Sequence, residues 1–60
     1  MTYTDYKRRC RVEANRQWCY AGLVEDHPER VRQAWQLREK PATFIQWLGE
    51  KYDLTPADKW

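Results

Sequence analysis

The sequence TDYKRRCRVEANRQWCYA, residues 4–21, repeats apolar side chains at the spacing of an α-helix. Three or four residues separate successive members of one stripe, which consists of Tyr6, Cys10, Ala14, Trp18 and Ala21. Most of the arginines lie off this stripe. Thr2 or Thr4 can cap the N-terminus through its hydroxyl, and Gly22 suits the position after the C-terminus. This stretch predicts an amphipathic helix over residues 4–21.

A second helix is expected over residues 28–39. Proline favours the first turn of a helix, which Pro28 would occupy. Asp26 or His27 can cap this turn, and Glu29, three residues after Asp26, completes the spacing of a capping box. The inward face is expected to consist of Val31, Ala34, Trp35 and the aliphatic stem of Arg38, flanked by Leu37.

A third helix is expected over residues 44–52. Pro41 disfavours helical backbone at Lys40, so the second helix should end before it. Thr43 and Gln46 have the spacing of a capping box. The apolar face of this helix is broad and comprises Phe44, Ile45, Trp47, Leu48 and Tyr52.

Gly49 interrupts this third pattern, because a glycine inside a helix costs roughly 1 kcal/mol relative to alanine. Either close packing against another backbone or simple tolerance explains it. No strand-like alternation, internal repeat or long linker is present. The 60 residues therefore predict a single all-α, three-helix domain, and at this size its core must be thin.

The segment after the third helix resembles the start of a further one, with a cap at Thr55, a first-turn Pro56 and an acid at Asp58. Only about one turn can follow in this sequence, and so short a helix is marginal. We expect residues 55–60 to form a tail that is mobile in the free monomer and ordered on association, with Trp60 as a contact residue.

Composition limits the class of protein. Hydrophobic residues make up 42% of the chain and charged residues 33%, which is too apolar for a disordered segment and too polar for a membrane protein. No apolar run approaches the ~18 residues of a membrane span. Residues 1–9 lead into charged side chains without the apolar core of a signal peptide. We expect a cytoplasmic protein.

The two cysteines, Cys10 and Cys19, are expected to be buried, reduced thiols. On one helix they would lie about 13 Å apart and point to opposite faces, which excludes a bridge between them. With His27 they supply only three soft ligands and none of the spacing of structural zinc. We expect neither a metal site nor a cofactor.

The sequence contains no recognisable set of catalytic residues. The chain has one histidine and no serine, and both cysteines lie within a predicted helix with no partner that would orient an imidazole. The acids are found at helix starts, where capping explains them. We therefore do not expect an enzyme.

Basic residues concentrate in residues 1–24, where they outnumber Asp5 and Glu13. Such a face can bind phosphate or acidic groups. An ordinary solvated helix face is the plainer interpretation, because the whole chain carries a formal charge of only +2.

Aromatic side chains make up 15% of the residues. Inward-pointing Trp18, Trp35 and Trp47, one on each helix, would close a three-helix core. A thin core cannot cover every ring, however, and exposed aromatic side chains beside arginine are typical of protein-binding surfaces. The candidate partner-binding residues are Lys7, Arg8, Arg9, Arg11, Arg16, Tyr20 and Trp60.

Residues 44–60, FIQWLGEKYDLTPADKW, resemble the front of a helix-turn-helix motif. Gly49 stands where the motif has a small residue, Asp53 replaces the usual turn glycine, and Thr55 opens the next helix. In the family that next helix reads bases in the major groove, but here too few residues follow to form it.

As a whole, the chain resembles the short accessory proteins of tailed bacteriophages of enterobacteria. The resemblance is carried by residues 8–18, RRCRVEANRQW, and by residues 27–54, HPERVRQAWQLREKPATFIQWLGEKYDL. It implies a protein made early in infection that binds and adjusts a host or phage factor, in the host cytoplasm. We therefore expect a non-enzymatic protein-binding modulator. The alternatives are a nucleic-acid binder that uses the basic first helix, either alone or as a dimer, and a structural homo-oligomer.

Overall fold

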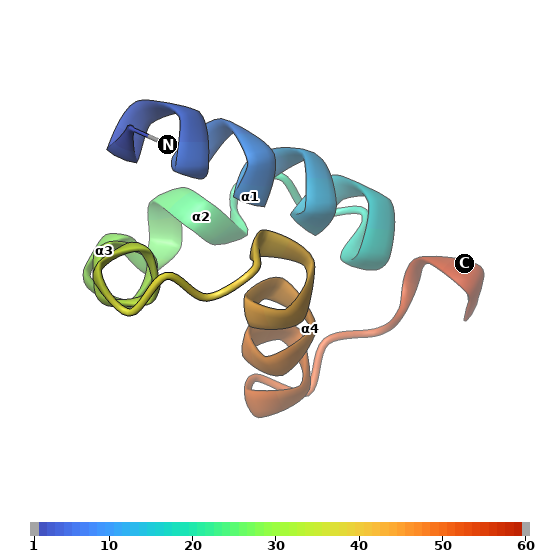
Figure 1. Ribbon diagram of the computed structural model, residues 1–60. Coiled ribbons are helices and arrows are strands. Elements are labelled where there is room, and N and C mark those ends of the chain that lie inside the picture. The colour runs from blue at the N-terminus through green and yellow to red at the C-terminus, as the bar shows by residue number, and fades with distance from the viewer. Residues whose placement is uncertain (1, 60) are drawn as a thin grey trace.

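The computed structural model describes residues 2–59, which are mostly helical and contain no strand (Figure 1). Three longer helices confirm the expected all-α, three-helix class, and a single-turn helix and a terminal 3-10 turn accompany them. In chain order the elements are α1 (Tyr3–Trp18), α2 (Leu23–Asp26), α3 (Pro28–Gln36), α4 (Pro41–Lys51) and the 3-10 turn η1 (Ala57–Lys59).

Helix α1 begins one residue before the predicted start and ends three residues before the predicted end. The Asp5 amide donates to the Thr2 hydroxyl over 3.2 Å, which identifies Thr2 as the N-terminal cap. The expected C-terminus at residue 21, with Gly22 after it, is wrong. Cys19 instead adopts left-handed backbone (φ 53°), and its amide and that of Tyr20 bond to the last carbonyls of the helix. This earlier end turns the chain back toward the core.

Helix α2 was not expected as a separate element. Leu23 and Val24 are each only 1% exposed, so this one turn supplies two core side chains. His27 separates α2 from α3 and caps α3 without a side-chain hydrogen bond. The capping box expected for Asp26 and Glu29 is therefore wrong.

Both boundaries between α3 and α4 differ from expectation. α3 ends at Gln36 rather than residue 39, because Arg38 adopts left-handed backbone with φ 59°. α4 begins at Pro41 rather than residue 44. Lys40 is extended, as a residue before proline should be, and Pro41 then takes the first turn. The expected box of Thr43 and Gln46 is wrong, since both residues lie inside the helix.

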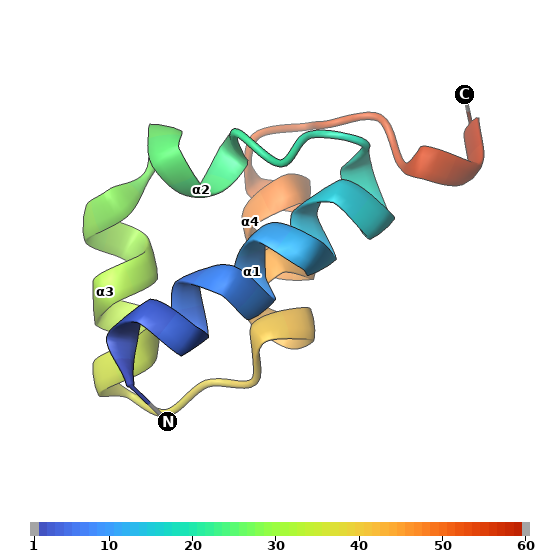
Figure 2. The same cartoon turned by 90° about the horizontal axis from the view of Figure 1, so that it is seen from above.

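α1 crosses α4, and α3 lies beside the N-terminal half of α1 (Figures 1 and 2). The buried core lies between these helices and consists of Tyr6, Cys10, Ala14, Trp18, Leu23, Val24, Val31, Ala34, Phe44, Ile45 and Leu48. The inward stripe expected along the first helix is thus confirmed over its helical part. Over residues 2–59, no helix combines the length and apolarity needed to cross a bilayer.

Trp18 forms a close contact between α1 and α4. Its indole Nε1 donates to the Ile45 carbonyl over 3.0 Å, so the ring lies directly on the backbone of α4. Gly49 leaves the space for this ring, because a Cβ at residue 49 would overlap the indole atoms. The structure therefore explains the glycine by close packing, although the contact is with the Trp18 ring rather than with another backbone.

The chain after α4 folds back along the molecule. Asp53 adopts left-handed backbone (φ 59°). Glycine usually has this conformation in the turn of a helix-turn-helix motif. The Leu54 amide then bonds to the Gly49 carbonyl over 2.9 Å, and Leu54 packs against the core. η1 contacts α1 as a 3-10 turn and offers no recognition helix. The expected contact residue Trp60 lies outside the described residues.

Candidate binding surface

The cations of α1 do not form a continuous face. Arg11 makes an ion pair with Glu25 of α2. Arg16 donates from Nε and Nη2 to Glu13 over 3.0 and 2.6 Å. Both of these arginines, which were expected to bind a partner, thus contact acids within the chain.

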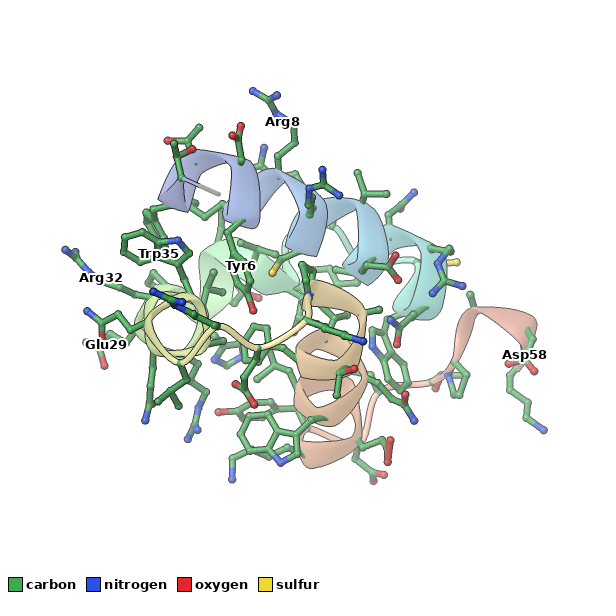
Figure 3. All side chains as sticks on the ribbon, viewed as in Figure 1. Tyr6, Arg8, Glu29, Arg32, Trp35 and Asp58 are labelled. Atoms are coloured by element: carbon green, nitrogen blue, oxygen red, sulfur yellow. The ribbon has the colours of Figure 1, made fainter. Side chains whose placement is uncertain are left out.

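Lys7 belongs to a cluster where α1 contacts α3. Its Nζ lies 5.7 Å from the centre of the Tyr3 ring, and the Arg32 guanidinium lies 5.8 Å from the same ring. Tyr3 in turn contacts Trp35, with ring centres 5.3 Å apart. Figure 3 shows Trp35 between α3 and the first turns of α1, with Arg32 directed outward. This arrangement leaves Trp35 half-buried, as part of the packing around the core.

Arg8 and Arg9 of α1 are exposed, and Figure 3 shows Arg8 directed away from the body of the molecule. Neither makes an ion pair within residues 2–59. Together with Lys40 they line a shallow hollow of about 850 Å³, which also contains Asp5 and Glu13. The hollow therefore has mixed charge with a modest basic excess.

Tyr20 follows the end of α1 and is 39% exposed. Its hydroxyl donates to the Asp26 carboxylate, which ties the loop to the end of α2. Cys19 beside it is exposed, so the expectation that both thiols are buried is right for Cys10 and wrong for Cys19. The early end of α1 is the cause, because it places residue 19 in a surface turn.

An apolar surface that the sequence prediction missed lies between α3 and α4. Trp47 is 49% exposed and Leu37 65% exposed, so the expectation that Trp47 points inward is wrong. Phe44, Ile45 and Leu48 fill the inward face of α4, and residue 47 falls at the edge of that face. The excess of large apolar residues on this helix was the only sequence signal.

A groove of about 300 Å³ runs along this surface, and we call it the Trp47 groove. Its walls come from both helices and from the turn that joins them, and they include Arg30, Ala34, Leu37, Glu39, Phe44 and Trp47. Ala34 and Phe44 are buried members of the core. The floor of the groove is therefore the edge of the hydrophobic core itself.

Two cations lie over the exposed indole. The Arg30 guanidinium and the Lys51 ammonium are each 5.6 Å from the centre of the Trp47 ring, within the range of a cation–π interaction. Neither cation has a carboxylate partner within residues 2–59. The groove thus combines apolar side chains with two cations that form no ion pair among residues 2–59, and Glu39 is the acid in its lining.

A second aromatic contact connects the far ends of α3 and α4. The rings of His27 and Tyr52 stack with centres 4.3 Å apart and an interplanar angle of 18°. His27 caps α3, and Tyr52 follows the last residue of α4. The stack holds these two helix ends together on the side of the groove away from the turn.

The buried titratable groups lie in the core. The Tyr6 hydroxyl is buried and has no hydrogen-bond partner among the described residues. Burial raises its pKa well above the usual value. Burial likewise raises the pKa of the Cys10 thiol to about 11, although the adjacent Tyr6 opposes this shift. Both groups are neutral at physiological pH, and no three His, Cys, Asp or Glu side chains of residues 2–59 converge on one point.

Comparison of the chain with protein-family models, with curated proteins and with solved structures finds no match.

Proposed function

We propose that this chain is a non-enzymatic binding protein that acts by contacting a partner protein through aromatic and basic side chains. The observation that carries the proposal is the exposed Trp47 beside Leu37, with Arg30 and Lys51 over its ring. Tryptophan and arginine are enriched among the residues that dominate binding energy. A small domain gains little by exposing a large apolar side chain unless a partner covers it.

The class of partner follows from the resemblance to phage accessory proteins, which implies a host or phage protein whose activity the chain adjusts. The test is an affinity pull-down from an enterobacterial lysate with the chain as bait, performed with and without nuclease. We expect a specific protein to remain bound after nuclease treatment. If nothing remains after that treatment, the proposal is wrong.

Nucleic-acid binding is the second candidate, because Arg8, Arg9 and Lys40 line one hollow. Few phosphates would be contacted, so binding should be weak, steeply salt-dependent and indifferent to sequence. Titration of double-stranded DNA at two salt concentrations tests this. Nanomolar affinity for one sequence at physiological salt, with strong discrimination against scrambled DNA, would contradict it.

A further inference from the structure

We propose that the Trp47 groove binds an acidic amphipathic segment of the partner protein. An apolar side chain of this segment packs on Leu37 and Trp47, and its carboxylates pair with Arg30 and Lys51. The inference rests on the proposed function and adds the site and the chemistry of the segment that the site accepts.

The Trp47 groove offers an apolar surface to a binding partner. Leu37 and Trp47 are the two most exposed large apolar side chains of the α3–α4 side, and they flank a floor formed by Ala34 and Phe44. A groove of about 300 Å³ has room for one or two side chains and is too small for a folded surface. This shape suits projecting side chains from one face of a helix or an extended segment.

Charge complementarity identifies the occupant as acidic. Arg30 and Lys51 already lie at the indole face, so their side chains are placed before binding. A carboxylate that reaches either cation gains an ion pair without breaking one, because both lack an acidic partner in residues 2–59. Such pairs at the edge of an apolar contact provide specificity and faster association.

Glu39 gives the groove a direction. It lines the groove at the turn between α3 and α4, whereas Arg30 belongs to the start of α3 and Lys51 to the end of α4. An acidic side chain near Glu39 would be repelled. The carboxylates of the bound segment must therefore lie toward the end away from the turn.

The same features disfavour a single-stranded nucleic acid as the occupant. A base could stack on Trp47, but its phosphates would approach Glu39, and Leu37 and Phe44 offer no hydrogen bonds to base edges. The aliphatic and aromatic lining is better matched by an apolar side chain.

The experiment is selection from a displayed library of random 16-residue peptides against the full chain. Binding of the selected peptides is then measured by fluorescence anisotropy. We expect peptides that carry Asp or Glu together with apolar residues at i and i+3 or i+4. Their affinity should fall at least tenfold in Trp47→Ala and in the double variant Arg30→Glu/Lys51→Glu.

Matched variants outside the groove serve as controls. Val12→Ala on α1 also truncates an exposed apolar side chain, and Lys59→Glu in η1 makes the same change in net charge as Lys51→Glu. Both should change the affinity less than twofold. Circular dichroism checks that each variant is folded, and Lys51→Glu alone replaces the double variant if that one unfolds. The double variant should also prefer peptides whose acids are replaced by lysine.

Several results would overturn the inference: no enrichment, enrichment of basic or neutral peptides, or equal losses in groove and control variants. Displacement of the peptides from Trp47 by an oligo-dT, or by self-association of the chain, would do the same. If the pull-down retains a protein after nuclease while this selection fails, only the groove assignment is wrong. If the pull-down retains none, the proposed function itself is wrong.

Discussion

Gly49 is the residue on which the crossing of α1 and α4 depends. The indole of Trp18 occupies the place of its missing side chain and bonds to the carbonyl one turn earlier, at Ile45. The same ring therefore fills space and satisfies its own buried N–H. Neither effect survives if the two backbones are pushed apart.

Gly49→Ala should destabilise the protein although alanine is the better helix former. The gain of about 1 kcal/mol in helix propensity is outweighed by overpacking against a rigid ring, which costs about 1–3 kcal/mol or more. Gly22→Ala is the matched control, because the chain has only these two glycines. Residue 22 has ordinary helical backbone, and its Cβ would come within 3.0 Å of the Tyr20 ring, which is 39% exposed and can shift slightly outward. Thermal melts of both variants test this, and equal melting temperatures would contradict it.

The two thiols should differ in reactivity. Cys19 is exposed and should react at once with a thiol reagent in the native protein, whereas Cys10 is fully buried and should react only on unfolding. Titration with the reagent, with and without denaturant, gives the number of thiols that react in the unfolded and in the native protein. Cys19→Ser should remove the rapid reaction of the native protein. Rapid labelling of both thiols in the native state would contradict the packing of Tyr6 and Cys10.

The raised pKa of Cys10 also predicts a pH dependence. The folded state holds this proton up to a pH of about 11, while the unfolded chain releases it near 9. Its contribution to stability is therefore complete below pH 9 and is lost as the pH rises from 9 toward 11. Chemical denaturation across this range should show a shallower decline in Cys10→Ala than in the wild type. An unchanged decline would show that the thiol is not the responsible group.

At the scale of elements, three helices end with a residue in left-handed backbone, and none of these three residues is glycine. Cys19, Arg38 and Asp53 follow α1, α3 and α4 with φ of 53°, 59° and 59°. In each case the next amide reaches back to a carbonyl of the last turn, over 3.4, 3.0 and 2.9 Å. This closes the helix end in the usual way, at the cost of a left-handed backbone that side chains other than glycine disfavour.

Arg38→Gly should therefore stabilise the protein. Relief of the left-handed backbone contributes about 1–2 kcal/mol, and the greater freedom of glycine in the unfolded chain offsets about 0.5–1 kcal/mol of it. We expect a melting temperature higher by a few degrees. Gln33→Gly, at an exposed position inside α3, is the control and should lower it. A lower melting temperature in both variants would contradict a left-handed backbone at Arg38.

At the scale of the whole molecule, stability depends on a core to which residues 2–59 contribute eleven buried side chains. A domain of this size buries only about 60% of its unfolded surface. Truncating one core side chain should therefore remove a large part of its free energy of unfolding. Leu48→Ala should unfold the domain or nearly so, since truncating a fully buried leucine costs about 2–5 kcal/mol. Leu37→Ala makes the same change at a 65% exposed position and should be nearly neutral. Similar melting temperatures for the two would show that the helical faces are assigned wrongly.

Sequence periodicity was sufficient for the all-α class and for most of the core. The stripe Tyr6, Cys10, Ala14 and Trp18 is buried as predicted, because spacing along one helix is a local property of the chain. The N-terminal cap at Thr2 is equally local. Helix ends were less predictable, since the left-handed turns fall on Cys19, Arg38 and Asp53 rather than on glycine.

Only the tertiary structure decided which large side chains are covered. Trp18 and Trp47 both lie on helices with an apolar face, yet one is 6% exposed and the other 49%. The difference arises because Trp18 packs on the backbone of α4 at Ile45 and Gly49, while Trp47 lies at the open groove between α3 and α4. The crossing of helices depends on contacts between distant residues, which local spacing does not encode. For the same reason the pairing of Arg11 and Arg16 with acids, and the position of Arg30 and Lys51 over Trp47, emerge only from the folded chain.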